Sequence, residues 1–398
     1  MKKIAVLAIA FLLFIPFASI NGSNVASNMS TNNILYVGGS GPNNYTKIQS
    51  AINDASNGYT IYVYAGIYRE HIRIYKPINL IGENENTTII DGMNETNVTV
   101  FSIDSDNVNF SHFTIRNILG GFWVYGIVAS GNNITISDCI IRNSDGLKIY
   151  SVEDGLIENC NFSHNYWGIF FATKCKNITI KNCTITYNLG KRCEDGGWIG
   201  GDGIKFMFNA YNFDDISVIN CNLSNNRLSG IDACNFKNLY VSNCSMDGSK
   251  WGISMLGMKN VTVLSCEFKN NLYYGIDIIN NTGNTLIKNC NITSTKNWSG
   301  IKILGEKEGK IYIDSCSIKN NDNYGIEIRN SRGVYIRYSD ILNNQIGVLT
   351  SFSMVDARYN YWGSPFGPSH LLGLKGDRII ARFSKVFYFP WLVKDYGE

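Results

Sequence analysis

The sequence predicts an all-β protein folded as a single-stranded parallel β-helix of about 11 turns, on three observations. First, a cysteine-centred segment returns at steps of 21, 23, 38, 23, 22, 24 and 26 residues. Second, each copy holds three short runs in which apolar and polar residues alternate, as in strands. Third, small polar residues separate these runs. Three strands can close within about 22 residues if each pairs with its own copy in the next turn, about 4.8 Å away.

The first strand of each copy begins with a Gly-Ile pair, followed by an outward residue and an inward one. The pairs are Gly126-Ile127, Gly168-Ile169, Gly203-Ile204, Gly230-Ile231, Gly252-Ile253, Gly275-Ile276, Gly300-Ile301 and Gly325-Ile326. The second strand has apolar residues five and three positions before the cysteine, and the third strand carries the cysteine. A leucine-rich horseshoe would need a helix per turn, and a propeller blade about 40 residues, so neither fits.

Eight of the eleven cysteines occupy one frame of this repeat. They are Cys139, Cys160, Cys183, Cys221, Cys244, Cys266, Cys290 and Cys316. Unpaired cysteine behaves as a small hydrophobe, so we expect these side chains to be inward, stacked and reduced. Disulfides or metal ligands are the alternative, although no Cys-x-x-Cys occurs.

Five residues after each of these cysteines comes a small polar residue. These are Ser144, Asn165, Asn188, Asn226, Ser249, Asn271, Thr295 and Asn321. Asparagine side chains stacked in register hydrogen-bond along the stack. We therefore expect a polar ladder at one bend of the coil.

The two ends of the chain differ from the repeat. Lys2 and Lys3 precede an apolar run, which predicts a signal peptide over residues 1–23, with an uncleaved anchor as the alternative. The rest should form one domain over residues 33–392, secreted or at the cell surface, with no further membrane span. Thr46 to Gln49 has the pattern of a capping box and opens a short N-terminal capping helix within residues 45–56. Residues 353–392 should close the other end.

The opening and closing segments resemble those of the right-handed β-helix superfamily, which includes pectin esterases, pectate lyases and a carbohydrate-binding and sugar-hydrolase group. The resemblance rests on Tyr45–Ile52, Ile61–Val63, Gly66–Glu70, Ile78–Gly82, Ile89–Gly92, Asn360–Pro368 and Tyr388–Leu392. It covers nearly the whole chain and implies a right-handed coil. The closing segment also resembles the β-helix of copper-insertion accessory proteins of nitrous oxide reductase. These motifs mark the fold and its caps, and a fold does not imply a reaction.

The outward residue of the first strand defines a stripe along the coil. It contains Val128, Lys148, Phe170, Lys205, Asp232, Ser254, Asp277, Lys302 and Glu327. An insertion loop over residues 189–202, rich in glycine and charge, interrupts the repeat beside this stripe, and such loops often carry function. The candidate catalytic residues are Asp202, Asp232, Asp277 and Lys302, and the candidate substrate-binding residues are Phe170, Trp198 and Lys205.

A glycoside hydrolase that inverts the anomeric configuration needs two carboxylates about 6.5–9.5 Å apart. Asp232 and Asp277, two turns apart, would be separated by about 9.6 Å. The segments Gly201–Ile204 and Gly300–Ile303 are similar to polygalacturonase motifs, but the Asp-Asp pair and the Gly-His-Gly of those enzymes are absent. A lyase would need calcium beside its lysine or arginine base, and the sequence has no dense aspartate cluster for it. No metal site and no cofactor are expected otherwise.

We expect a monomer that binds or processes extracellular polysaccharide along this sheet, as a hydrolase or lyase if it is an enzyme. The alternative is a non-catalytic cell-surface protein, for adhesion or envelope structure, with solvated and inert stripe charges.

The rings before the repeat glycines form either a sugar platform or a packed corner. They are Tyr125, Trp167, Trp251, Tyr274 and Tyr324. Asn-x-Ser/Thr sequons would allow glycosylation outside the cell. Nucleic acid is not an expected partner, because 35 basic and 32 acidic residues nearly balance.

Overall fold

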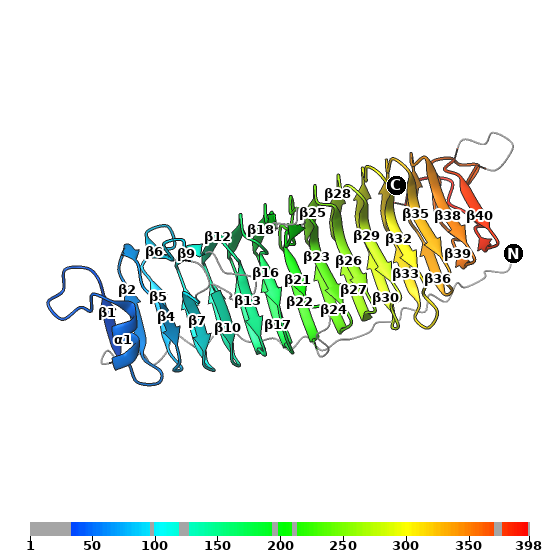
Figure 1. Cartoon of the computed structure of the whole chain (residues 1–398). Helices are drawn as coiled ribbons and strands as arrows, with labels where there is room; N and C mark the ends of the chain where they lie inside the picture. The colour runs from blue at the N-terminus through cyan, green and yellow to red at the C-terminus, as the bar shows by residue number, and fades with distance from the viewer. Residues whose placement is uncertain are drawn as a thin grey trace, which may run out of the picture. The chain divides into compact units, whose positions relative to one another are not determined.

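A computed structural model describes residues 33–95, 99–118, 127–192, 198–208, 213–369 and 376–396. The predicted signal peptide (1–23), Tyr125 and Cys193 lie outside these ranges. The described residues from Ile34 onward form a coil in which consecutive turns stack as parallel strands (Figure 1). None of the described helices has the length and hydropathy needed to cross a membrane.

Two long parallel sheets and a shorter third face form the wall of the coil. The first is a 15-stranded sheet of β1 (Ile34–Val37), β2 (Thr60–Val63), β5 (Asn79–Gly82), β8 (Val108–Ser111), β11 (Ile134–Ser137), β14 (Glu153–Glu158), β17 (Lys176–Lys181), β22 (Asp214–Ile219), β24 (Lys237–Ser242), β27 (Lys259–Leu264), β30 (Thr285–Lys288), β33 (Ile311–Asp314), β36 (Val334–Arg337), β39 (Met354–Asp356) and β41 (Lys385–Phe387). The second is a 13-stranded sheet of β4 (Ile72–Ile74), β7 (Phe101–Asp104), β10 (Ile127–Ser130), β13 (Leu147–Tyr150), β16 (Ile169–Phe171), β21 (Ile204–Phe206), β23 (Ser229–Cys234), β26 (Trp251–Leu256), β29 (Tyr274–Ile279), β32 (Ser299–Leu304), β35 (Tyr324–Arg329), β38 (Ile346–Ser351) and β40 (Ile379–Arg382).

The third face consists of two shorter parallel sheets. One contains β3 (Gly66–Tyr68), β6 (Thr88–Asp91), β9 (Thr114–Ile118), β12 (Ile140–Ser144), β15 (Asn161–Ser163) and β18 (Thr184–Thr186). The other contains β25 (Ser245–Asp247), β28 (Glu267–Lys269), β31 (Asn291–Thr293), β34 (Ser317–Lys319) and β37 (Asp340–Leu342). Single bridges through Asn222 join the two. Within the insertion, β19 (Lys191–Arg192) and β20 (Trp198–Ile199) pair antiparallel.

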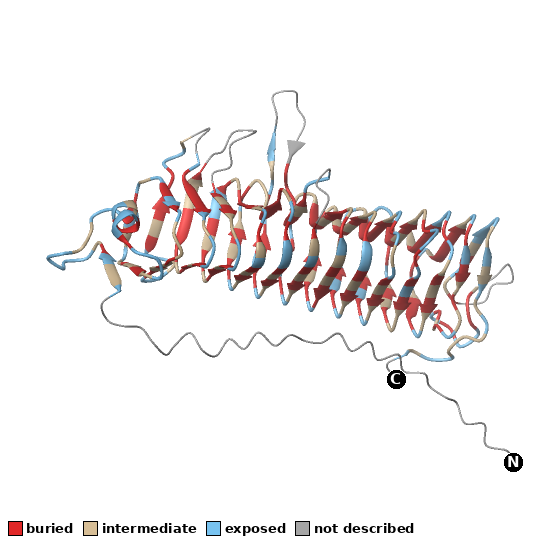
Figure 2. Ribbon diagram, turned by 90° about the horizontal axis from the view of Figure 1, so that it is seen from below, coloured by how far each residue is buried: buried red, intermediate tan, exposed pale blue. Residues whose placement is uncertain are grey.

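The predicted β-helix is confirmed, with about 13 turns instead of about 11. The early turns between β1 and β9 lack the cysteine frame, so the repeat did not reveal them all. The segment predicted to close the coil also supplies β40 and β41, which extend both long sheets. Buried and exposed residues alternate along the strands (Figure 2), and the inward ones form one continuous apolar core.

The residue before each cysteine explains why the frame begins with Asn, Asp or Ser. Asn159, Asn182 and Asn289 have φ of 55°, 55° and 53°, in the left-handed region that asparagine tolerates better than most residues. This conformation turns the chain between the second and third strands. At Gly252 a Cβ would lie 2.5 Å from the carbonyl oxygen of Gly275, so the next turn leaves room only for glycine.

The stacked cysteines are inward and unpaired, as predicted: all eight are buried and free. Cys183 illustrates their contacts, because its Sγ lies 3.3 Å from the carbonyl oxygen of Lys181 and 3.7 Å from that of Ile157 in the preceding turn. Outside the frame, burial raises the pKa of the Cys175 thiol to about 11. These thiols therefore act as small core side chains.

The predicted polar ladder is also present. Of the predicted members, Thr295 is not an acceptor: its buried Oγ1 has no hydrogen-bond partner among the described residues. In the other steps the backbone N–H of one turn donates to the side chain of the next turn. The acceptors are the side chains of Asn165, Asn188, Asn226, Ser249, Asn271, Asn321, Asn344 and Asp377. The Asn226 amide also donates to the carbonyl oxygens of Ile185 and Leu223, at 2.8 and 2.9 Å. The ladder therefore satisfies buried backbone groups where the chain bends away from the sheets.

The N-terminal helix α1 (Ile48–Asp54) covers the first turn with Ile48, Ala51 and Ile52, but the predicted capping box is wrong. Its N-cap, Lys47, makes no side-chain capping bond. Instead, the Glu70 carboxylate accepts the N–H groups of Ile48 and Gln49, at 2.8 and 3.0 Å. A carboxylate from a neighbouring strand thus satisfies the free donors and complements the helix dipole, which a local sequence pattern cannot reveal.

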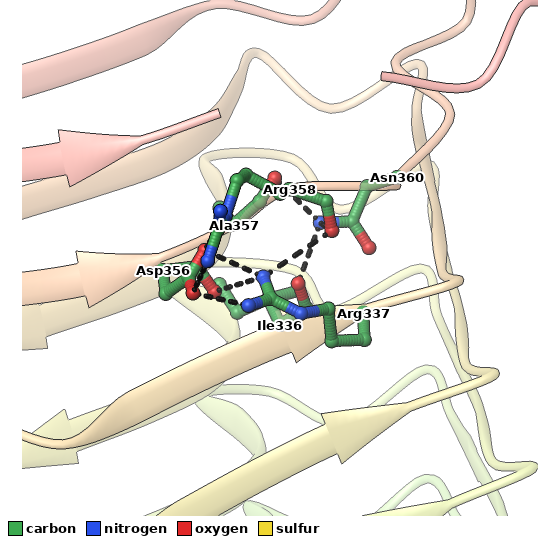
Figure 3. Close-up of polar contacts among 6 residues, drawn as sticks. All are labelled: Ile336, Arg337, Asp356, Ala357, Arg358 and Asn360. Atoms are coloured by element: carbon green, nitrogen blue, oxygen red, sulfur yellow. Dashed lines mark hydrogen bonds and ion pairs between the residues drawn. The ribbon is translucent and has the colours of Figure 1, made fainter. Parts of the chain in front are cut away.

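An arginine-clamped carboxylate holds the last turns of the 15-stranded sheet together (Figure 3). Arg337 and Arg358 both donate to Asp356, and hydrogen bonds from Arg358 and Arg337 hold the pKa of Asp356 below its ordinary value. Asn360 donates to the carbonyl oxygens of Ile336 and Ala357, both at 2.8 Å. This network ties β36 to the segment after β39.

We predict that Asn226→Ala destabilises the protein by about 2–4 kcal/mol, because it leaves several buried backbone groups without partners. Urea unfolding followed by circular dichroism measures the change. Asn291→Ala, an exposed position on the third face, is the matched control and should change stability by less than about 0.5 kcal/mol. Equal effects at the two positions would contradict a structural role for the ladder.

We predict that the ten described thiols resist iodoacetamide in the folded protein, because they are buried. After denaturation without reductant, all ten should be alkylated. Peptide mass spectrometry of both samples measures the modification. Disulfide-blocked peptides from the eight stacked positions would contradict the ladder of free thiols.

Candidate functional site

The predicted outward stripe is present and in strict register. In the 13-stranded sheet, Lys205 pairs with Asp232, and Asp277 pairs with Lys302. Ser254 joins Asp232 to Asp277, and Glu327 follows Lys302. Neighbouring members are therefore about 4.8 Å apart along the stack. Charges far apart in sequence become direct neighbours.

Outward orientation does not make these side chains exposed, and the expectation that Asp277 is solvated is wrong. Asp277 and Glu327 are each only 5% exposed, and Tyr274 is 3% exposed. The Lys302 ammonium lies 4.7 Å from the Tyr274 ring centroid and 3.3 Å from Asp277 Oδ1. Burial raises the pKa of Asp277, and the Lys302 charge opposes the rise. The side chains of adjacent turns cover the carboxylate.

Each carboxylate of the stripe has a cationic partner. Lys205 forms an ion pair with Asp232, Lys302 with Asp277, and Arg329 with Glu327 at 2.5 Å. Ser299 Oγ also donates to Glu327 Oε2 at 2.9 Å. Asp277 and Glu327 lie on either side of Lys302, two turns apart, which places them about 9.6 Å from each other. The stripe is therefore a row of alternating, mutually compensating charges.

The insertion brings Asp202 to the stripe but buries it. Asp202 is 2% exposed, and its Oδ1 accepts the backbone N–H of Ser229 at 3.2 Å. Burial raises the pKa of Asp202 to about 7; Lys205 opposes this rise and Asp232 adds to it. The backbone of Trp198 pairs with Arg192, but the Trp198 side chain lies outside the described residues. Asp202 is thus placed to hold the bend rather than to meet a polymer.

The Phe170 ring is packed against neighbouring side chains and is not accessible to a ligand. It is 7% exposed and stacks on Trp167 at 4.8 Å between ring centroids. The Lys148 ammonium lies 4.2 Å from the Tyr150 ring centroid and 5.6 Å from that of Phe170. Burial lowers the pKa of Lys148 to about 7. Among the residues that the structure describes, Phe170 and Lys148 therefore form no open aromatic platform at this end of the stripe.

A pocket opens farther along the same sheet, which we call the ring pocket. Its volume is about 370 Å³, and its lining residues are Tyr274, Trp298, Lys302, Leu304, Asn323, Tyr324, Glu327 and Arg329. Trp298 is 50% exposed and lies 5.2 Å from Tyr274 and 5.4 Å from Tyr273, between ring centroids. The pocket combines an open aromatic surface with charged hydrogen-bonding groups, which is the usual composition of a ligand site.

Only part of the ring pocket was predicted. The sequence predicts Lys302 as a catalytic candidate, Tyr274 and Tyr324 as rings of a platform or a packed corner, and Glu327 as a member of the stripe. Trp298 was missed because it lies two residues before its repeat glycine, whereas the other rings directly precede theirs. The rings combine the two predicted alternatives, a packed corner and an open platform. Tyr273 packs between Trp251 and Trp298, whereas half of the Trp298 surface stays exposed.

No site for a metal ion is formed by the residues that the structure describes: no three His, Cys, Asp or Glu side chains come together in a way that could hold one.

Comparisons with known proteins agree with this architecture. The family model "Right handed beta helix region" matches residues 78–246, 125–292 and 251–361. Over 24% of this chain the sequence is 31% identical to probable pectinesterase/pectinesterase inhibitor 41 of Arabidopsis thaliana, and the match spans 20% of that protein. The chain thus spans about a fifth of that relative.

Several solved structures share the fold at low sequence identity. The A-module of mannuronan C-5 epimerase AlgE4 from Azotobacter vinelandii has a TM-score of 0.52 and 15% identity, covering 87% of this chain and 94% of that one. The surface adhesin PfbA of Streptococcus pneumoniae has a TM-score of 0.56 and 15% identity, covering 78% and 86%. The family 28 exopolygalacturonase of Yersinia enterocolitica has a TM-score of 0.54 and 10% identity, covering 85% and 74%.

We predict that Asp202→Asn removes a pH-dependent loss of stability. The pKa of Asp202 rises from an ordinary value of 3.8 to about 7 in the folded chain. Between these values the unfolded chain releases a proton that the folded chain keeps, so wild-type stability falls as pH rises from about 4 to 7. The variant should gain up to about 4 kcal/mol relative to wild type over this range. Denaturant midpoints at pH 4, 5, 6 and 7 measure it, and a constant difference would contradict it.

Proposed function

We propose that this chain, which belongs to the right-handed β-helix family, binds an extracellular polysaccharide on the outer face of its 13-stranded sheet, centred on the ring pocket. One observation carries the proposal. Trp298 presents an open indole face beside Lys302, Glu327 and Arg329, which provide hydrogen-bond donors and acceptors. A sugar ring has apolar C–H faces and a rim of hydroxyls, so it matches both parts of this pocket.

Each lining residue has a distinct role in this proposal. Trp298 and Tyr324 provide surfaces against which sugar rings pack. Asn323 offers an amide donor and acceptor for hydroxyls. The ion pair between Glu327 and Arg329 is already formed, so its geometry is set before a ligand arrives.

The fold comparisons support a polysaccharide as the partner. By their names, two of the similar structures, the mannuronan epimerase and the exopolygalacturonase, act on polysaccharides, and PfbA is a surface adhesin. The N-terminal signal pattern supports a location outside the cytoplasm, secreted or at the cell surface.

The ion pairs favour binding over cleavage. A hydrolase needs one carboxyl free to protonate the leaving oxygen and a second to activate water or attack the sugar. Here Asp232, Asp277 and Glu327 each face a cation, and the spacing from Asp277 to Glu327 is at the upper limit for inversion. Adhesion through a bound polysaccharide is the use of this face that requires no free acid.

We predict that Trp298→Ala weakens polysaccharide binding about 10-fold, because it removes the open ring of the pocket. Affinity electrophoresis or a glycan array with polygalacturonate, alginate, dextran and xylan measures the effect. Tyr187→Ala is the matched control, since Tyr187 is 48% exposed but directly follows β18 on the third face. Absence of binding to every polymer would overturn the proposal.

A product assay separates binding from chemistry. Bound polymers are incubated with the protein, and reducing ends and unsaturated products are measured. We expect no product above background. Product formation that Asp277→Asn or Lys302→Gln abolishes would overturn the preference for binding and assign the stripe a catalytic role.

A further inference from the structure

A second pocket lies at the other end of the same strands, which we call the basic pocket. Its volume is about 630 Å³, and its lining residues are Asn280, Leu304, Gly305, Lys307, Asn330, Arg332 and Phe352. Leu304 belongs to the lining of both pockets. The ring pocket lies toward the starts of β29, β32 and β35, and the basic pocket follows their ends. The two pockets are therefore contiguous across the sheet.

The cations of the basic pocket differ from those of the ring pocket. Lys302 and Arg329, which line the ring pocket, form ion pairs with Asp277 and Glu327. Lys307 and Arg332 are exposed, and neither forms an ion pair with any residue that the structure describes. Glu308 is exposed on the same loop and pairs with neither. The pocket therefore presents two cations whose charge the protein does not compensate.

Of the two carboxylates that flank Lys307 in sequence, Glu306 is directed inward. Glu306 is 0% exposed, and its Oε1 accepts the backbone N–H of Asn281 at 2.7 Å. Burial raises the pKa of Glu306 to about 7. Glu306 is part of an inner polar column, in which its own N–H donates to Ser331 Oγ at 3.1 Å. It is thus unsuited to neutralise the surface cations beside it.

Uncharged groups complete the basic pocket. Asn280 and Asn330 are exposed amides on the same wall. Phe352 is 63% exposed and stacks on Phe383 at 5.2 Å between ring centroids. Amides, an open ring and two cations together suit a sugar unit that carries a negative charge.

A path along the axis of the coil is poorly suited to a polymer. Toward the N-terminus, Phe170 and Lys148 are packed against neighbouring rings and are 7% and 3% exposed. A path parallel to β32 is accessible at both ends of this strand, because Trp298 before it and Lys307 after it are exposed. Six-residue strands such as β32 span about 20 Å, enough for several sugar units in a row.

Resting on the proposed function, we propose that the polysaccharide lies parallel to the strands, perpendicular to the axis of the coil, and that Lys307 and Arg332 bind a carboxylate or sulfate group of one sugar unit. The ligand class is thereby narrowed to an acidic polysaccharide. The ring pocket holds a sugar ring by packing, and the basic pocket selects for charge.

The test compares polymers that differ only in charge. Binding is measured for polygalacturonate against its fully methyl-esterified form, and for dextran sulfate against dextran. The double variant Lys307→Gln/Arg332→Gln should weaken binding to the charged polymers by between about 2-fold and 30-fold and leave the uncharged ones unchanged. Its affinity should also depend less on salt concentration.

The control Arg142→Gln/Lys269→Gln removes the same charge from exposed positions on β12 and β28, on the third face. An equal loss in this control, or an equal loss for uncharged polymers, would overturn the basic pocket as a charge-selective site. Thermal melting of both double variants confirms that they fold.

The outcomes separate the two proposals. Charged and uncharged polymers that bind equally, with Trp298→Ala weakening both and the double variant weakening neither, would overturn only the basic pocket. Absence of binding by the wild-type chain would overturn both proposals together.

Discussion

Strand pairing between successive turns is the constraint from which the other features follow. Each residue of a turn lies about 4.8 Å from its counterpart in the next, so one kind of side chain must tolerate its own copy as a neighbour. Inside the coil, apolar residues and free cysteines meet that condition. At the bend, asparagine meets it because its amide oxygen accepts from the preceding turn while its NH₂ group donates to that turn and to its own.

The same constraint acts on the outer face, but there unlike side chains stack on one another, because charges of opposite sign alternate. Like charges repel at this spacing, and the column alternates accordingly, with Asp277 beside Lys302 and Lys302 beside Glu327. Such alternation stabilises the sheet and leaves each carboxylate of the stripe paired with a cation. The groups that we propose to add for recognition lie outside the stripe: Trp298 at one end of the strands, and Lys307 and Arg332 at the other.

The sheet and register of the predicted stripe are therefore confirmed, whereas its role as a functional site stays a prediction. The repeat placed Asp232, Asp277 and Lys302 in one column, because strand periodicity determines which side chains point outward. It did not show that Asp277 and Phe170 are covered, since the covering atoms belong to other turns. Trp298, Lys307 and Arg332 lie outside the repeated positions, so periodicity gave them no weight.

By itself the sequence determined the parallel coil, the inward free cysteines and the polar ladder, because each depends on the local alternation of residues and on a period that brings copies together. The tertiary structure alone decided the number of turns, the capping of α1 by Glu70, the burial of Asp202 and the position of the two pockets. These features arise between side chains from different turns and loops. Their distances depend on packing in three dimensions, which a one-dimensional pattern does not contain.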